Sequence, residues 1–364
     1  MRIAQVAPLH ESCPPARYGG TERVVSWLTE ELVRLGHDVT LFASGDSRTA
    51  ARLVPVRERA LRLDPMAGDP LIPHLVMFNR VLSELEGFDV VHFHTDYLHF
   101  PAFRAHAARS VTTLHGRLDL AELAAVYGEF GEMPLVSISE AQRRPLPWAN
   151  WAATVLHGLP GGCYGDRGGR GGYLAFVGRI SPEKRPDLAI EIAARAGLPL
   201  RIAAKVDRQD RDYFREVVRP LLARPGVEFL GEVGDADKAA LLGEALALVF
   251  PIDWPEPFGL VMIEAMASGT PVIAFRRGAV PEVVDEGVTG AIVDDVDGAV
   301  GAVERVAGLS RAGVRARFEE RFSVERMARD YLNVYDTAAG DGPFIPEVAS
   351  ESPLAASAGR HYAA

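Results

Sequence analysis

The sequence is poor in cysteine and has no long hydrophobic run. Its two cysteines, Cys13 and Cys163, form neither a CxxC pair nor a metal-type cluster, so we predict no zinc site or disulfide framework. Two free thiols are typical of a reducing cytosol. No stretch of eighteen apolar residues occurs, and the apolar N-terminal run ends at Pro8, too early for a signal peptide. We expect a cytoplasmic protein, with peripheral contact at the inner face of a membrane left open.

Positive charge is also scarce. The chain carries 39 Lys and Arg residues against 49 Asp and Glu residues, which gives a formal net charge of -10 at pH 7. This balance does not favour binding to nucleic-acid phosphates, which requires clustered basic residues. The dinucleotide-binding pattern GxGxxG is absent as well, which argues against an NAD-binding dehydrogenase. An anionic small ligand would need a local basic pocket.

The first half of the chain alternates short apolar runs with helical periodicity. Residues 21–35 have apolar side chains at helical spacing, and Gly36 ends the helix. Six short apolar runs are predicted as strands: 3–7, 38–43, 89–94, 110–115, 135–139 and 153–156. Strands that alternate with helices are typical of a doubly wound parallel sheet.

The second half repeats the same alternation after a glycine-rich run. Residues 161–172 are predicted to be a flexible linker that packs no core. Six further strands are expected at 173–177, 200–204, 227–230, 247–250, 271–275 and 290–293. A chain of 364 residues is long enough for two such domains, which we place at 1–160 and 173–323. Residues 311–338 are predicted to be helical, and the tail at 339–364 to be disordered.

Two carboxylates flank a predicted helix start in the second domain. The proline-rich part of the segment from Trp254 cannot be helical, whereas residues 259–267 are good helix formers. Gly259 therefore lies near a helix N-terminus, whose free N–H groups favour a diphosphate. Glu256 precedes it and Glu264 lies two turns on, so both can accept hydrogen bonds from sugar hydroxyls. A lone glutamate pair at this spacing often occurs by chance as solvated surface charges, but the strand–loop–helix context favours the functional interpretation.

A basic turn follows the first strand of the same domain. Arg179 and Lys184 lie between this strand and the next helix. Cations at this place can neutralise a diphosphate as it leaves. A generic basic turn is the alternative, and the neighbouring helix N-terminus favours the functional interpretation.

Two features of the first domain are candidate contacts for substrate. Gly19 and Gly20 form a glycine turn at the start of the first helix, suited to a phosphate or a sugar hydroxyl. His115 ends a strand and precedes Gly116, which makes it the best candidate histidine for touching a substrate.

Several histidines gather after the third strand. They are His92, His94 and His99, with Asp96 among them. Such a group invites a zinc site, but His92 and His94 share one face of a strand, where structural histidines are common. We predict no metal site and assign His94 and Asp96 to the acceptor.

These motifs resemble glycosyltransferase family 4, which has the GT-B fold of two Rossmann-like domains facing a cleft. The likeness runs from Met1 to about Ala338. Glu256 to Glu264, within Pro-Glu-Pro-Phe-Gly-Leu, is similar to the family's Glu-x7-Glu motif. Residues 268–274 and 278–284 are similar to the segments that follow it. The departures are Arg185 where many members have glycine, His157-Gly158 where many have Asn-Gly, and Ala204 where many have glycine.

The resemblance implies a role for each matching residue. Glu256 and the backbone at Phe258, Gly259 and Leu260 would bind the donor sugar, and Glu264 the ribose. Arg179 and Lys184 would hold the diphosphate, Gly20 would approach it, and His115 would contact the sugar. The C-terminal helix, at about 324–338, would complete the first domain.

The implied activity is the retaining transfer of a hexose from a UDP-, GDP- or ADP-sugar to a hydroxyl of a sugar, a lipid or a small molecule. No metal or other cofactor is expected. The catalytic set would be His115, Glu256, Arg179 and Lys184. An epimerase of the same fold and a non-catalytic protein that binds nucleotide sugars or glycans are the alternatives.

Overall fold

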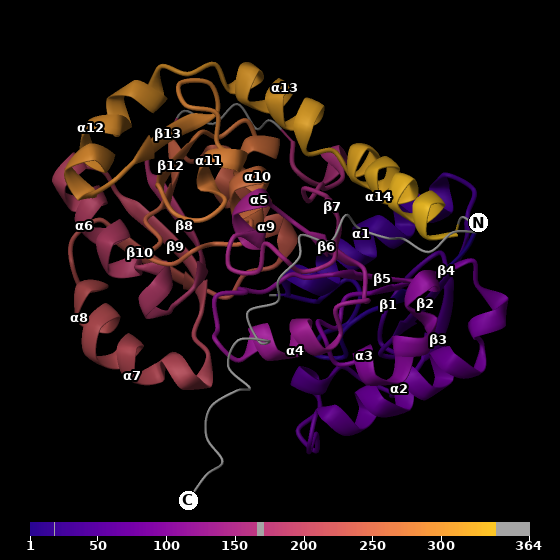
Figure 1. Cartoon of the computed structure of the whole chain (residues 1–364). Coiled ribbons are helices and arrows are strands. Elements are labelled where there is room, and N and C mark those ends of the chain that lie inside the picture. The colour runs from indigo at the N-terminus through magenta and orange to yellow at the C-terminus, as the bar shows by residue number, and fades with distance from the viewer. Residues whose placement is uncertain (18, 166–170, 340–364) are drawn as a thin grey trace, which may run out of the picture. The chain divides into compact units, whose positions relative to one another are not determined.

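The computed structural model describes most of the chain as two compact units (Figure 1). The described residues are 1–17, 19–165 and 171–339. Unit 1 contains residues 1–13, 29–155 and 329–339. Unit 2 contains residues 14–28 and 156–328. Except for Ala339, the tail predicted to be disordered lies outside the described residues, as does part of the predicted linker, 166–170.

Unit 1 is built on a seven-stranded parallel sheet. Its strands are β1 (Arg2–Val6), β2 (Asp38–Ala43), β3 (Arg52–Pro55), β4 (Val90–Phe93), β5 (Ser110–Thr113), β6 (Leu135–Ser137) and β7 (Trp151–Thr154). Their order is β3-β2-β1-β4-β5-β6-β7, so the winding reverses between β1 and β4. Strand β3 was not predicted from the sequence, because this edge strand is half-exposed and contains no continuous apolar run.

Helices cover this sheet and close its core. They are α1 (Gly20–Arg34), whose first half belongs to unit 2, α2 (Leu71–Ser83), α3 (Phe100–Phe103), α4 (Leu123–Glu129) and α5 (Glu140–Arg143). The core cluster joins aromatic side chains from α2, β4 and α3, among them Phe78, Phe93 and Phe103. Phe78 meets Phe93 edge to face, with 6.3 Å between the ring centroids.

Unit 2 repeats the arrangement on six parallel strands. They are β8 (Leu174–Arg179), β9 (Leu200–Lys205), β10 (Val227–Gly231), β11 (Ala247–Phe250), β12 (Val272–Phe275) and β13 (Gly290–Val293). The order β10-β9-β8-β11-β12-β13 reverses between β8 and β11, which is the arrangement of dinucleotide-binding folds. The prediction of two doubly wound parallel sheets is confirmed.

The helices of unit 2 lie between and after these strands. They are α6 (Pro186–Ala196), α7 (Arg211–Tyr213), α8 (Arg219–Leu221), α9 (Asp235–Glu244), α10 (Leu260–Ala267), α11 (Val280–Val283), α12 (Val296–Ala307) and α13 (Arg311–Arg321). The core cluster of this unit joins α6 and α12 to the central strands through side chains such as Ile190, Ile273 and Val303.

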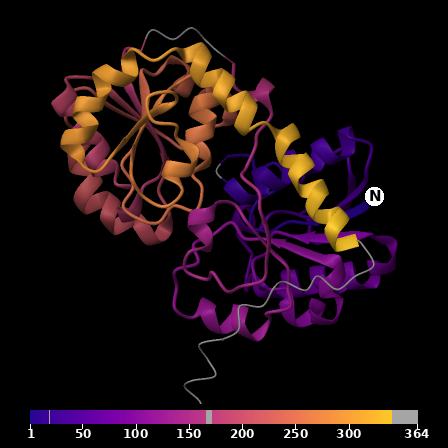
Figure 2. The same cartoon turned by 45° about the horizontal axis from the view of Figure 1, so that its top comes forward.

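The predicted continuous helix at 311–338 is wrong in one respect, because the structure has two helices there. Helix α13 ends at Arg321, and α14 (Val324–Ala339) follows it. Figures 1 and 2 show both helices as the yellow ribbons. Leu159 interrupts the helical hydrogen bonds: its N–H donates to the Phe322 carbonyl at 2.9 Å, and its carbonyl accepts from the Val324 N–H at 3.1 Å. A partner distant in the sequence therefore breaks a helix that local periodicity predicts as continuous.

Gly278 allows two loops of unit 2 to approach each other closely. Its φ of 50° lies in the left-handed region. A methyl group on Gly278 would lie 2.2 Å from the Glu256 carbonyl oxygen and 2.4 Å from the Glu256 nitrogen. The neighbouring Ala279 N–H donates to that carbonyl at 2.9 Å. The segment at 278–279 therefore fixes the backbone of Glu256, which gives a physical reason for its similarity to the family motif.

We predict that Gly278→Ala displaces the Glu256 backbone, whereas Gly287→Ala does not. Gly287 is the matched control, because its φ of 73° is also left-handed but nothing lies within 4 Å of an added methyl group. Each alanine should lower the free energy of unfolding by about 1–2 kcal/mol through backbone strain. Only Gly278→Ala should also lose enzymatic activity. Equal activity in the two variants would contradict the close approach. Thermal unfolding and activity assays measure the two effects.

Candidate active site

The predicted site residues of each unit gather where the winding of its sheet reverses. Doubly wound sheets bind ligands beyond the carboxyl ends of their strands at this place. In unit 2, Arg179 is the last residue of β8, and the segment after β11 carries Glu256. In unit 1, His94 directly follows β4, and His115 lies just beyond the end of β5.

Glu256 is held by two side chains. It is 7% exposed, and its Oε2 atom accepts hydrogen bonds from Lys184 Nζ and, at 2.9 Å, from Trp254 Nε1. The Lys184 ammonium also lies 4.8 Å from the centre of the Trp254 ring, within the range of a cation–π interaction. Trp254 therefore contacts both charged partners. Sequence reasoning placed it in the segment but gave it no role.

The helix α10 begins four residues after Glu256. Gly259 precedes the helix with φ 83°, and Leu260 is its first residue, which agrees with the predicted helix start. This left-handed φ favours glycine, and an added methyl group would also lie 3.3 Å from the Phe250 ring. Phe258 is buried and packs against His157, with 4.8 Å between the ring centroids. The first turn of a helix has backbone N–H groups without partners four residues back, and in α10 this turn follows Glu256 along the chain.

Glu264 points into a second cluster of unit 2. It is 3% exposed, and its Oε1 atom accepts hydrogen bonds from Tyr164 Oη at 2.9 Å and from Lys238 Nζ at 2.5 Å. Burial and the neighbouring carboxylate raise the pKa of Tyr164 well above its usual range, so the phenol stays protonated and donates. Lys238 lies on α9.

Tyr164 corrects the prediction for the glycine-rich run. That run was expected to pack no core, yet the Tyr164 ring is 2% exposed and its hydroxyl meets a buried carboxylate. Tyr164 is the only aromatic residue between positions 161 and 172, and this is the signal in the sequence that could have found it.

Arg179 precedes the turn that carries Lys184, and Arg185 follows it directly. The Arg179 guanidinium is paired with Glu183 and lies 3.9 Å from Asp207, which also pairs with Lys205 at 2.7 Å. Arg185 adopts a left-handed conformation with φ 51° and pairs with Asp187 at 2.9 Å. The glycine that many family members carry here suits this conformation, and Arg185 adopts it at a cost.

All lysines of the sequence lie in unit 2. The sequence contains three lysines among its 39 basic residues: Lys184, Lys205 and Lys238. Two of them hold Glu256 and Glu264, and the third lies at the end of β9. A lysine ammonium is a compact charge with three donors that can be shared between a protein carboxylate and a ligand.

The glycine turn at the start of α1 belongs to unit 2. Gly20 is the first residue of the helix, and Gly19 precedes it. A methyl group on Gly20 would lie 3.5 Å from the Leu260 side chain of α10. The sequence placed both glycines in the first domain, but the structure groups residues 14–28 with unit 2.

In unit 1, His94 is buried, whereas its neighbour His115 is partly exposed. His94 is 2% exposed, and its Nδ1 and Nε2 atoms lie 2.9 Å from His115 Nε2 and from Gln5 Oε1, respectively. Both ring nitrogens therefore bond within the protein, which argues against the predicted direct contact of His94 with an acceptor. Desolvation lowers the pKa of the half-buried His115 to about 3, so its ring is neutral at physiological pH.

Asp96 lies on the loop that follows β4. Its backbone is left-handed, with φ 48°, and the residue is exposed. Its assignment to the acceptor stays a prediction.

The histidines near β4 bond to hydroxyl and amide groups instead of gathering around a common point. His92 bonds to Tyr335 and Thr113, and His99 bonds to Thr112. Among residues 1–17, 19–165 and 171–339, no group of three or more His, Cys, Asp or Glu side chains could hold a metal ion. In the same ranges, no helix is both long and apolar enough to cross a membrane.

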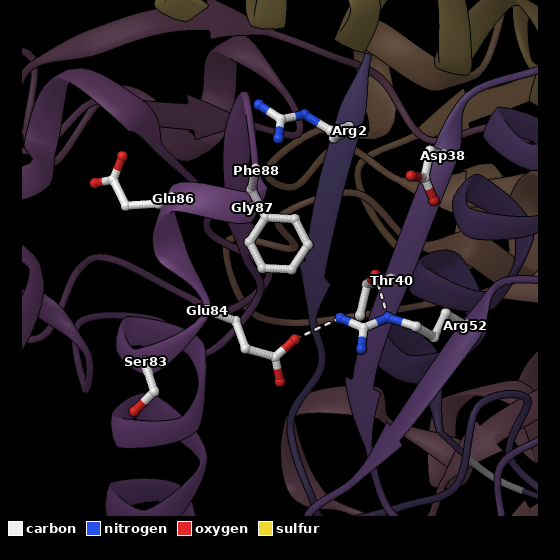
Figure 3. A pocket seen from close by; sticks show the side chains of 9 residues that line it. All are labelled: Arg2, Asp38, Thr40, Arg52, Ser83, Glu84, Glu86, Gly87 and Phe88. Atoms are coloured by element: carbon white, nitrogen blue, oxygen red, sulfur yellow. Dashed lines mark hydrogen bonds and ion pairs between the residues drawn. The ribbon is translucent and has the colours of Figure 1, made fainter.

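A pocket of about 500 Å³ lies at the opposite edge of the unit 1 sheet (Figure 3). Arg2 and Asp38 line it at the first residues of β1 and β2, so it is remote from the carboxyl ends of these strands. Its arginines are already paired: Arg52 with Glu84, and Arg2 with Asp89 at 2.7 Å. This pocket does not have the features of the donor site.

Comparisons with known proteins agree with this geometry. A model described as "Glycosyltransferase Family 4" matches residues 18–157, and one described as "Glycosyl transferases group 1" matches residues 168–320. The phosphatidyl-myo-inositol mannosyltransferase of Mycolicibacterium smegmatis is 28% identical over 94% of this chain and 95% of its own.

Two solved structures share the fold. AviGT4, a glycosyltransferase involved in avilamycin A biosynthesis, has a TM-score of 0.73 and 24% identity, over 94% of this chain and 98% of its own. Anabaena Alr3699/HepE in complex with UDP and glucose has a TM-score of 0.71 and 17% identity, over 93% of this chain and all of its own. Family models match both halves of the sequence, and both sheets are doubly wound, so the chain belongs to glycosyltransferase family 4 and is a glycosyltransferase of the GT-B fold.

Proposed function

We propose that the chain moves a hexosyl group from a nucleotide-diphosphate sugar to an acceptor hydroxyl, with retention of the anomeric configuration and without a metal. The observation that carries this proposal is the pair of buried carboxylates, Glu256 and Glu264, each held by its own lysine around the N-terminus of α10. Carboxylates fixed in this way are suited to accept hydrogen bonds from sugar hydroxyls.

The donor would lie along this segment of unit 2. Glu256 would bind the hexose hydroxyls and Glu264 the ribose. Lys184 donates to Glu256 in the free protein, and its two remaining N–H groups can donate to a diphosphate. Arg179 would supply a second cation. As the bond to the sugar breaks, negative charge grows on the diphosphate, and these cations together with the N–H groups of α10 would stabilise it.

The acceptor hydroxyl would attack the face of the sugar from which the diphosphate leaves. Glu256 is the one carboxylate that invites the role of covalent nucleophile, but Lys184 and Trp254 both bind its Oε2 atom. A carboxylate bound in this way is a weaker nucleophile, and we assign Glu256 to binding. His115 would contact the transferred sugar as a neutral ring.

The acceptor class and the place of action are part of the proposal. A relative is named for transfer to phosphatidyl-myo-inositol, so an inositol hydroxyl is the first acceptor to test, alongside sugars and other lipids. We propose that the protein acts in the cytoplasm, where nucleotide sugars are made, and that a lipid acceptor would bring it to the inner face of the membrane.

We predict that one class among UDP-, GDP- and ADP-sugars raises the unfolding temperature more than the others. A ligand at 100 times its Kd stabilises the folded state by about 2.7 kcal/mol. With the selected donor and an acceptor, NMR should show a product with the anomeric configuration of the donor, at equal rates in EDTA and in Mg²⁺. An altered sugar formed from donor alone would indicate an epimerase, and binding without turnover a binding protein. An inverted product or strict metal dependence would contradict the mechanism.

We predict that Lys184→Ala abolishes transfer while the fold is kept, because the diphosphate and Glu256 lose their shared cation. Arg276→Ala is the control, since it removes an exposed cation of the same unit that pairs only loosely with Asp294 at 3.3 Å. Steady-state kinetics and thermal unfolding distinguish the two variants. Full activity of Lys184→Ala would refute the assignment to the diphosphate.

We predict that Trp254→Phe lowers kcat/KM by at least about tenfold, because it removes the N–H bond to Glu256 and leaves an aromatic ring near Lys184. A hydrogen bond to a charged group contributes about 1.5–3 kcal/mol. Trp151→Phe is the matched control: it removes an indole bond of 2.8 Å to the Leu146 carbonyl in unit 1. This control should lower stability and leave kcat/KM unchanged. Equal kinetic effects of the two variants would show that Trp254 has no role in the site.

A further inference from the structure

A continuous chain of hydrogen bonds runs from His115 into the core of unit 1. Its members come from β1, β4, β5, the segments after β4 and β5, and α14, and they are His115, His94, Gln5, Tyr335, His92, Thr113 and Tyr331. Every member except His115 is at most 2% exposed. The donor–acceptor distances lie between 2.7 and 3.0 Å, so each contact is a full hydrogen bond.

The orientation of the Gln5 amide sets the direction of this chain. Gln5 Oε1 faces His94 Nε2 at 2.9 Å, and Gln5 Nε2 donates to the Tyr335 hydroxyl at 3.0 Å. An amide oxygen can only accept, so His94 carries a proton on Nε2. The Tyr335 hydroxyl, which accepts from Gln5, donates in turn to His92 Nδ1 at 2.7 Å.

The positions of the protons on the three histidine rings follow from these contacts and from burial. Desolvation lowers the pKa of His115 to about 3 and holds the pKa of His92 well below its usual range, so both rings are neutral near pH 7. Burial also favours the neutral form of His94, whose Nδ1 then accepts. His115 Nε2 lies 2.9 Å from that atom and must be the donor, because two facing lone pairs at this distance repel.

We infer that Gln5 and His94 are positioning residues that hold His115 in the tautomer with its proton on Nε2, so that its Nδ1 accepts a hydrogen bond from a substrate hydroxyl. The role of His115 toward substrate rests on the proposed function, whereas the tautomer follows from the contacts of unit 1 alone.

Helix α14 contributes to this selection. Tyr335 is fully buried, and its hydroxyl bonds to Gln5 Nε2 at 3.0 Å and to His92 Nδ1 at 2.7 Å, so it holds the far end of the amide. Tyr331, one turn earlier on the same helix, is equally buried. Its hydroxyl bonds to Thr113 at 2.9 Å, and this bond is the one farthest from His115 in the series of hydrogen bonds. The two tyrosines therefore differ in their connection to His115 and not in burial.

The experiment is ¹⁵N NMR of the histidine rings in the full-length protein near neutral pH, without ligand. His115 is assigned by the signal that disappears in His115→Asn. We expect its ring to carry the proton on Nε2, and Tyr335→Phe to produce a mixture of tautomers. Tyr331→Phe is the matched control and should leave His115 as in the wild type. A proton on Nδ1 in the wild type, or identical spectra for the two tyrosine variants, would overturn the inference. If Tyr335→Phe fails to fold, the tautomer of His115 in the wild-type protein still tests the inference.

Kinetics separate this inference from the proposed function. With an active donor and acceptor, His94→Leu should lower kcat by about 10–100-fold, by analogy with the loss of residues that orient metal-binding histidines. His94→Gln, which keeps one acceptor and one donor, should restore most of kcat. Equal activity of the leucine and glutamine variants would refute the positioning role. A protein that shows the Nε2 tautomer but transfers no sugar would refute the function and leave the tautomer assignment intact.

Discussion

A carboxylate that is less than one-tenth exposed needs a cation or several donors beside it, and this requirement organises the site of unit 2. Glu256 and Glu264 are 7% and 3% exposed, and each is matched by one lysine and one further donor. An unpaired charge at such a position would cost several kcal/mol. The turn that carries Lys184, the helix that carries Lys238 and the run that carries Tyr164 are thereby tied to α10. The segments on which the donor would depend are held by the same interactions that stabilise the buried charges.

The fold could be predicted from the sequence because parallel strands buried on both faces appear as short apolar runs. Eleven of the twelve runs match strands with each end shifted by at most two residues, three of them without any shift, and the run at 153–156 overlaps β7 with both ends shifted by two. The prediction failed where a distant partner decides the local structure. Leu159 breaks the helix at Phe322, and β3 is a strand because it pairs with β2. Local patterns contain no information on either contact.

Some residues of the candidate site could likewise be predicted from the sequence, and others could not. Glu256, Glu264, Arg179 and Lys184 could be found because a strand, a loop and a helix start follow one another in the sequence. Trp254 and Lys238 could not be assigned, because each acts on a carboxylate that local patterns do not connect to it. For Tyr164 the sequence offered only its place as the one aromatic residue of the glycine-rich run, and its partner Glu264 lies 100 positions away. In unit 1, Gln5 and Tyr335 are 330 positions apart and meet only in the folded chain. The burial of His94 likewise depends on neighbours that the sequence pattern does not specify.

The scarcity of lysine has a consequence for chemical labelling. Arginine supplies the rest of the basic residues, and it does not react with amine-directed acylating reagents under mild conditions. Apart from the N-terminal amine, such a reagent can modify this chain only at Lys184, Lys205 and Lys238, all in unit 2. The side chains of Lys184, Lys238 and Lys205 are 14%, 13% and 18% exposed, and each is paired with a carboxylate, Lys205 with Asp207 at 2.7 Å. Apart from the N-terminal amine, the rate of amine acylation therefore reports on these three ion pairs of unit 2.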